Sequence, residues 1–272
     1  MTVQHDTAVD GPMFSQEAPP AGGDLPGQVH REPVAQRIVR TLEVCAAARK
    51  RALTIVELVH ETGLPKTTVH RMCWQLVELG MLEYTSEGFA VGSKLFALAA
   101  TNPGISQLRV AAIPFLVELQ RCTGAMPSLA VFADNRALVL DGLFTHESSR
   151  IARLVGYALP LHCTGTGKAI AARLDPEVRE KLLFRRRLPS ATRGTIVQPA
   201  VLRQHLTKVA ETGVAYADEE FLPGVKSVAA GFTLRGGGVA AIGVVEAWNS
   251  PTLRRAPTAV TAAAAALEKS LG

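Results

Sequence analysis

Apolar side chains return at helical spacing from Val34 onward, where Ile38, Leu42 and Cys45 stand at positions i, i+4 and i+7. This spacing predicts an amphipathic helix with one buried face. The helix is expected to end at the basic run 49–51, because positive charge is favourable at a helix C-terminus.

Two further helices are predicted from their end signals. Thr54 and Glu57 form a capping-box pattern, in which each side chain accepts a hydrogen bond from the other residue's backbone. Gly63 suits the end of this helix, while Pro65 and Gly80 suit the start and the end of the next one. Two helices joined by a short turn that contains Gly are the outline of a helix-turn-helix.

A β-hairpin is predicted directly after these helices, from two short apolar runs at 81–84 and 89–91 around the polar turn 85–88. A hairpin in this place is the wing of a winged helix-turn-helix. A helical pattern resumes over 92–100, and after an Asn-Pro-Gly break a long amphipathic helix is expected over 105–123.

The remainder of the chain alternates between short apolar runs and helical patterns. Strands are expected at 128–133, 137–143, 151–155, 214–218, 227–234 and 239–247, and helices at 164–173, 176–184, 199–211 and 257–271. Hairpins mixed with helices favour an α/β (α+β) domain built on a largely antiparallel sheet.

The 272 residues are long enough for about two domains. We expect a disordered tail over 1–31, which is rich in Pro, Gly, Ala and Gln and has no periodic apolar pattern. A winged helix-turn-helix domain is expected over 32–93, a linker helix over 94–104 and a second domain over 105–272.

Composition narrows the class of protein. With 47% hydrophobic and 19% charged residues, the chain has enough apolar side chains to form hydrophobic cores. It contains no apolar stretch of the length that a membrane helix needs. The four cysteines, Cys45, Cys73, Cys122 and Cys163, are widely separated. This spacing favours a reduced, cytoplasmic protein over a disulfide framework or a zinc site.

The net charge of +5 is not concentrated where DNA binding is expected. Residues 1–31 carry a net charge of −3, residues 32–97 one of +1, and residues 98–272 one of +7. Net charge alone is therefore weak evidence for a nucleic-acid partner.

The third helix, 66–79, has an apolar and a polar face. Its apolar residues fall on one side of a helical wheel: Val69, Met72, Cys73, Leu76 and Leu79. The opposite side carries hydroxyl, imidazole and guanidinium groups, which suit phosphate oxygens and base edges. Any globular helix has a polar outer face, so it is the order of cap, turn, helix and hairpin that favours DNA binding.

We therefore expect Thr67, Thr68 and Arg71 to read DNA bases, and Lys66 and His70 to contact phosphates. Trp74 lies on the same outer side, where it is expected to pack on a neighbouring helix rather than on the DNA backbone.

A second candidate site lies at the start of the helix over 164–173. Backbone N–H groups at a helix start bind carboxylates or phosphates, and glycines at 165 and 167 let a ligand approach closely. The alternative is a simple helix cap at Thr164. A phosphate-binding P-loop is excluded, because His162 stands where it needs Gly and Ala169 where it needs Ser or Thr.

The acidic run Asp218-Glu219-Glu220 is not read as paired catalytic carboxylates, because adjacent strand residues point to opposite sides. Asp218 is expected in a pocket wall, and Glu219 and Glu220 in a solvated turn. The neighbours His162 and Cys163 are too few for a metal site. No nucleophile–base pair with a supporting third group is found, so we expect no enzyme, no catalytic residue, no metal and no cofactor.

Three stretches together resemble one family, the IclR-type transcriptional regulators: Gly63-Leu64-Pro65-Lys66-Thr67-Thr68-Val69-His70-Arg71, Leu161-His162-Cys163-Thr164-Gly165-Thr166-Gly167-Lys168-Ala169, and Tyr216-Ala217-Asp218-Glu219-Glu220-Phe221 with Pro223-Gly224-Val225-Lys226-Ser227-Val228-Ala229-Ala230. The resemblance covers about 34–271. It implies an N-terminal winged helix and a GAF-like C-terminal domain that binds a small organic effector. It also implies a homodimer or a dimer of dimers on a palindromic double-stranded DNA operator.

On this resemblance the effector-binding residues are expected to be Gly165, Thr166, Asp218 and Ser227, with Leu154 and Val225 in an apolar wall. Relatives often carry Cys where Ser227 stands, and some carry hydroxyl residues where Gly243 and Val245 stand. A larger or partly aromatic organic acid therefore fits better than a small, very polar one.

The sequence thus predicts a ligand-responsive transcriptional regulator, most simply a repressor of genes for small-molecule metabolism. The alternative is a small-molecule-binding or catalytic α/β domain whose N-terminal helices serve only dimerisation.

Overall fold

A computed structural model describes residues 32–48, 52–143, 154–185, 187–247 and 255–271. The expectations for the tail 1–31 and the basic run 49–51 lie outside these residues. The chain divides into two compact units that meet between Leu95 and Phe96, and each is described by itself. No helix in the described part is both long and apolar enough to cross a membrane.

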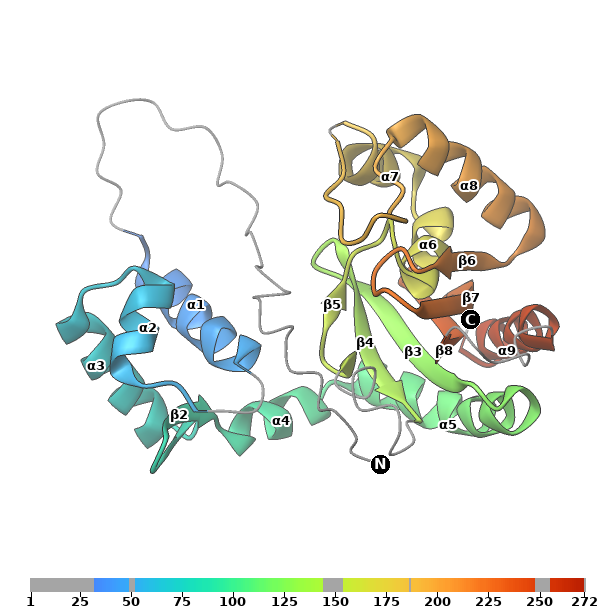
Figure 1. The fold of residues 1–272 in the computed structure, drawn as a ribbon. Helices are drawn as coiled ribbons and strands as arrows, with labels where there is room; N and C mark the ends of the chain where they lie inside the picture. The colour runs from blue at the N-terminus through green and yellow to red at the C-terminus, as the bar shows by residue number, and fades with distance from the viewer. Residues whose placement is uncertain (1–31, 49–51, 144–153, 186, 248–254, 272) are drawn as a thin grey trace, which may run out of the picture. The chain divides into compact units, whose positions relative to one another are not determined.

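The first unit consists of three helices and a hairpin: α1 (Val34–Ala47), α2 (Ile55–Thr62), α3 (Lys66–Glu78), β1 (Leu82–Thr85) and β2 (Gly88–Val91) (Figure 1). The strands β1 and β2 are antiparallel, as expected of a wing. The core residues come from all of these parts: Cys45, Leu53, Leu58, Val69, Met72, Cys73, Leu76, Leu82 and Phe89.

The helix-end signals predicted from the sequence are present at both ends of α2. Thr54 Oγ1 accepts a hydrogen bond from the Glu57 N–H (3.3 Å), and Glu57 Oε2 accepts one from the Thr54 N–H (2.9 Å), which completes the capping box. Gly63 ends α2 in the left-handed region, at φ +65°. Leu53 exchanges two 2.8 Å backbone hydrogen bonds with Phe89, which joins the segment before α2 to the hairpin.

Two helices follow the hairpin. The helix α4 (Ser93–Ala100) buries none of its residues. The helix α5 (Pro103–Thr123) begins with the Asn102 side chain, which accepts a 3.1 Å hydrogen bond from the Ile105 N–H. The Asn-Pro-Gly segment, expected as a break, is thus also the start of the long helix, because Pro suits a first turn.

The second unit is built on a six-stranded sheet in the order β5-β4-β3-β8-β7-β6. Its strands are β3 (Met126–Ala133), β4 (Arg136–Gly142), β5 (Ala158–Leu159), β6 (Ala215–Asp218), β7 (Val225–Thr233) and β8 (Val239–Ala247). Every neighbouring pair is antiparallel, which confirms the predicted sheet type.

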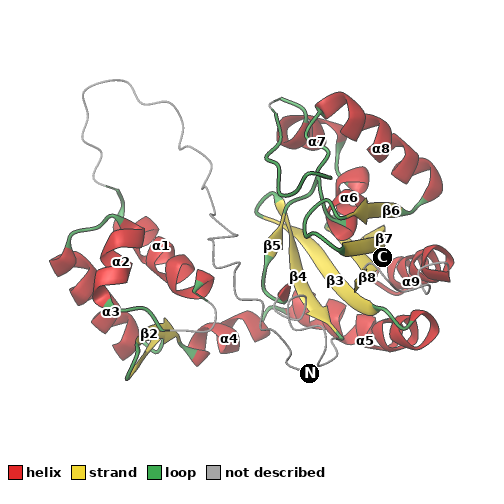
Figure 2. Cartoon of the chain, in the orientation of Figure 1, coloured by secondary structure: helices red, strands yellow, loops and turns green. Residues whose placement is uncertain are grey.

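Helices cover both faces of this sheet (Figures 1 and 2). α5 and α9 (Ala256–Leu271) pack on one face, where Leu116 and Leu267 meet Phe232 in one core. α6 (Gly165–Arg173), α7 (Pro176–Leu183) and α8 (Pro199–Thr212) belong to the other side, where Ile170 and Leu202 share a second core. Because both faces are buried, the neighbouring strands β7 and β8 carry continuous apolar runs, at 228–232 and 239–245, rather than alternating patterns.

One predicted strand is wrong. The expected strand 151–155 begins outside the described residues, and its described end, Leu154 and Val155, belongs to a turn in which the Tyr157 N–H donates to the Leu154 carbonyl (2.9 Å). Gly156 adopts φ +81°, which redirects the chain. The edge strand β5 therefore forms only at Ala158 and Leu159, opposite Leu138 and Ala137.

Candidate functional site

The outer face of α3 is open to solvent where DNA contacts are expected. Lys66, Thr67, His70 and Arg71 are exposed, and Thr68 is half-buried. The predicted apolar face is buried except at its end: Leu79 is exposed. The reason is that α3 ends at Glu78, so that Leu79 caps the helix instead of continuing its inner stripe.

Trp74 ties this outer face to the hairpin, contrary to the expectation that it packs on a neighbouring helix. Its ring centroid lies 5.0 Å from that of Tyr84 and 5.6 Å from that of Phe89. Its indole N–H donates to His70 Nε2 at 3.2 Å. An indole nitrogen can only donate, so His70 Nε2 must be unprotonated and its Nδ1–H remains as a donor for another acceptor.

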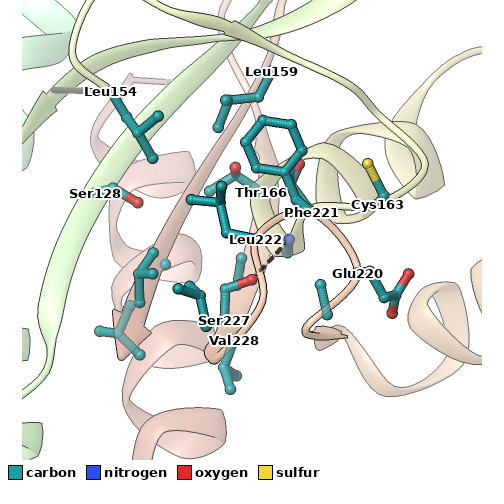
Figure 3. A pocket seen from close by; sticks show the side chains of 18 of the residues that line it. Ser128, Leu154, Leu159, Cys163, Thr166, Glu220, Phe221, Leu222, Ser227 and Val228 are labelled. Atoms are coloured by element: carbon teal, nitrogen blue, oxygen red, sulfur yellow. Dashed lines mark hydrogen bonds between the residues drawn. The ribbon is translucent and has the colours of Figure 1, made fainter. Parts of the chain in front are cut away.

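A cavity opens in the second unit between the start of α6, the sheet and the loop after β6 (Figure 3). Its walls are largely apolar, and its lining includes Ser128, Val139, Leu154, Leu159, Cys163, Thr164, Gly165, Thr166, Ala217, Glu220, Phe221, Leu222, Val225, Ser227, Ala229, Gly243 and Val245. Five of the six residues expected to bind the effector belong to this lining: Leu154, Gly165, Thr166, Val225 and Ser227.

The start of α6 is fixed by two side-chain hydroxyls. Thr164 Oγ1 accepts from the Gly167 N–H (3.1 Å) and donates to the Pro160 carbonyl (2.9 Å). Ser227 Oγ on β7 accepts from the Gly165 N–H (3.0 Å), which Figure 3 marks as a dashed line. The approach is so close that a Cβ on Gly165 would lie 2.8 Å from Ser227 Oγ. One of the two backbone donors expected for the ligand is therefore already engaged within the protein.

A buried ion pair stands behind this helix start. Lys168 has no exposed surface, and its Nζ lies 2.5 Å from Glu220 Oε1 and 3.1 Å from the Tyr216 carbonyl. The expectation of a solvated turn at Glu220 is thus wrong, because the buried ammonium draws this carboxylate inward. Glu219, in contrast, is half-buried and closes the loop by accepting from the Gly224 N–H (2.7 Å).

Asp218 does not belong to the cavity lining, which corrects the prediction of a pocket wall there. The strand β6 alternates: Ala217 points inward and Asp218 outward, where its carboxylate pairs with Lys226 Nζ at 3.0 Å. The alternation of Ala215 and Ala217 with polar neighbours is visible in the sequence and carries this signal. The sequence analysis did not assign the lining residues Ser128, Phe221 and Leu222 to the pocket. Ser128 lies outside the stretches that resemble the family, whereas Phe221 ends one of them and Leu222 follows it directly.

Two titratable groups at this site, the Cys163 thiol and the His162 imidazole, are shifted toward their neutral forms. Burial raises the pKa of the Cys163 thiol to about 12, and the Glu220 carboxylate adds to the effect. Such a thiol is protonated at neutral pH and is a poor nucleophile. Burial lowers the pKa of His162, whose Nε2–H donates to the Pro189 carbonyl at 2.9 Å. Within the described ranges no three His, Cys, Asp or Glu side chains gather as a metal site would require.

Both units match models of known families. Residues 34–86 match the IclR helix-turn-helix domain, and residues 105–268 match the C-terminal domain of the bacterial transcriptional regulator IclR.

Individual relatives agree with these matches. The transcriptional repressor IclR of Escherichia coli (strain K12) is 29% identical over 183 residues, which are 66% of this chain and 67% of that protein. The HTH-type transcriptional regulator BhcR of Paracoccus denitrificans is 32% identical over 213 residues, 77% of this chain and 75% of its own. A solved structure of an IclR homologue from Microbacterium hydrocarbonoxydans, complexed with 4-hydroxybenzoate, superposes with a TM-score of 0.75 at 27% identity and covers 86% of this chain and 97% of its own.

The buried His162 should make the second unit sensitive to acid. The pKa of His162 is lowered in the folded protein, whereas in the unfolded chain it has its ordinary value of about 6.5. The unfolded state then binds more protons below about pH 6.5, so the free energy of unfolding should fall as the pH drops, by up to about 1.4 kcal/mol per pH unit.

Urea unfolding of the protein and of His162→Gln at pH 7 and pH 5 measures this effect. We expect a smaller acid loss in the variant, whose amide can still donate to the Pro189 carbonyl. The exposed His60 serves as control, and His60→Gln should keep the pH dependence of the original protein. Equal acid losses in all three proteins would show that His162 is not the responsible group.

Proposed function

The chain belongs to the IclR family of bacterial transcriptional regulators, and on this premise we propose that it is a cytoplasmic repressor controlled by an organic acid. Members of this family bind DNA through the helix-turn-helix and respond to small ligands. The exposed polar face of α3 supports the DNA-binding part of the proposal, and the cavity at the start of α6 supports the ligand-binding part.

We assign base reading to Thr67, Thr68 and Arg71, and phosphate contacts to Lys66 and His70. A recognition helix uses the residues near its N-terminus in this way. Of the three residues assigned to base reading, only Arg71 can donate two parallel hydrogen bonds to one guanine. His70 donates through Nδ1, because its Nε2 accepts from Trp74.

Arg71→Ala should weaken specific DNA binding by about tenfold or more, since one good bidentate base contact is worth about 1–3 kcal/mol. Fluorescence anisotropy with the DNA upstream of the protein's own gene measures the loss. The melting temperature should stay within a degree or two, because Arg71 is exposed.

Val69→Asp is the converse variant. Val69 is fully buried, so the new charge should unfold the first unit. Arg71→Ala would contradict the assignment if it unfolded the protein or left specific binding unchanged.

We propose that α4 pairs with a second copy of the chain, so that two recognition helices meet a palindromic operator. α4 has eight residues, and Phe96 and Leu98 are 73% and 51% exposed. An isolated helix this short is not stable in water unless other structure packs against it. A twofold-symmetric dimer would cover these side chains and place the two α3 helices on successive half-sites. A dimer of such dimers is compatible with the same contact.

Phe96→Asp should therefore shift the protein toward monomers in sedimentation velocity at micromolar concentration. Val56→Asp is the matched control, because Val56 is 71% exposed on α2, and it should leave the sedimentation coefficient unchanged. An unchanged assembly in Phe96→Asp would contradict the role of α4.

We propose that the effector's carboxylate lies at the start of α6. The Gly165 N–H is engaged by Ser227 Oγ, which leaves the Ser227 O–H and the Thr166 N–H to donate to the ligand. The positive end of the α6 dipole favours the anion further. Leu154 and Val225 would enclose the apolar body. The relative that binds 4-hydroxybenzoate supports an aromatic acid of this kind.

Ligand binding would change operator affinity only as far as the ligand prefers one of the protein's two states. Depending on which state the acid prefers, it would release the repressor from its operator or hold it there.

Benzoate should raise the melting temperature more than benzamide at equal concentration. A carboxylate accepts charge-assisted hydrogen bonds that are about twice as strong as those of a neutral amide. Differential scanning fluorimetry measures both shifts. Ser227→Ala should reduce the benzoate shift, because it removes a donor to the carboxylate. Equal shifts from acid and amide would contradict an anion site at the start of α6.

A further inference from the structure

Two serines stand at opposite ends of the cavity floor. Ser227 on β7 pairs with Val245 on β8, whereas Ser128 on β3 pairs with Gly243 on β8. The two serines are therefore two strands apart and offset by two residues, roughly 10 Å across the strands and roughly 7 Å along them. Both belong to the cavity lining, so the floor carries a hydroxyl at each end.

The floor between the two hydroxyls consists of Gly243 and Val245 on β8 and Ala229 on β7. Gly243 lies opposite Ser128 on one side and Ala229 on the other. A Cβ on Gly243 would lie 2.7 Å from the Cβ of Ala229, so the close strand spacing leaves no room for a side chain. Gly243, Ala229 and Val245 form an apolar surface, and the missing side chain at Gly243 leaves room for the face of a planar ring.

The hydroxyl of Ser128 makes no hydrogen bond to the described part of the chain. The residue is 7% exposed, and no hydrogen-bond partner for its side chain is found among the described residues. Figure 3 shows its oxygen pointing into the cavity, on the side opposite Thr166 and Ser227. Because the hydroxyl faces the cavity, a ligand group there can hydrogen-bond to it without displacing a partner among the described residues.

We infer that Ser128 is a second polar anchor, and that the cavity takes a planar ring carboxylate with a hydroxyl at the end remote from the carboxylate. The inference rests on the proposed carboxylate position at Ser227 and Thr166. The ring then lies over Gly243, and its distant hydroxyl reaches Ser128. A hydroxyl next to the carboxylate lies at the wrong end of the floor and gains nothing from Ser128.

Isothermal titration of the full chain with benzoate, 2-hydroxybenzoate and 4-hydroxybenzoate tests this arrangement. The intact protein should bind 4-hydroxybenzoate about tenfold more tightly than benzoate, as expected of one added hydrogen bond to a buried group. The 2-hydroxy isomer should show no such gain. In Ser128→Ala the preference for the 4-hydroxy acid should fall to within about twofold, with benzoate affinity unchanged.

Ser227→Ala is the matched control at the other end of the floor. It should weaken benzoate and 4-hydroxybenzoate by the same factor and keep the preference between them. The inference is overturned if benzoate binds but the 4-hydroxy group adds nothing, or if the preference survives in Ser128→Ala. Those outcomes leave the carboxylate site intact, whereas failure of all three acids to bind the intact protein would reject the site and the anchor together.

Discussion

Lys168 lies in the first turn of α6 with its ammonium wholly inside the protein, and Glu220 reaches it from the loop after β6. Burying two charges costs free energy that their attraction only partly returns, and removing one partner from such a pair typically costs about 3–5 kcal/mol. Glu220 Oε2 has no hydrogen-bond partner among the described residues, so only one of the two carboxylate oxygens is satisfied by the ion pair. What the ion pair contributes is position: it holds the loop after β6 against the start of α6.

The cavity exists because this loop is fixed. Phe221 and Leu222 follow Glu220 directly and form one wall of the cavity, and Thr195 Oγ1 holds the Glu220 carbonyl at 2.6 Å. Ser227, at the end of the same segment, holds the Gly165 N–H from the strand side. One short stretch thus joins the helix start, the sheet and the apolar wall, and the shape of the binding space follows from these contacts.

The regular elements could be predicted from the sequence because their signals are local. The capping box at Thr54 and the glycine stop at Gly63 give the same answer in any context, and continuous apolar runs mark the buried strands β7 and β8. The errors arise where tertiary contacts decide. A buried ammonium 52 positions away draws Glu220 inward, and Trp74 finds its aromatic partners on the hairpin. The glycines at the start of α6 pointed to the cavity there, but nothing in the sequence pointed to Ser128, since only strand register brings it to the cavity floor.

The hydrogen bond from the Gly165 N–H to Ser227 Oγ determines which donors remain for a ligand at the start of α6. Because Ser227 Oγ already satisfies this donor, the Gly165 N–H does not need a ligand as its hydrogen-bond partner. In the proposed site, an arriving acid would gain hydrogen bonds from Ser227 and Thr166, and one from Ser128 if it carries a hydroxyl at its distant end. Because the Gly165–Ser227 hydrogen bond can stay in place, the proposed site would take up and release an acid without remaking the contact between α6 and the sheet.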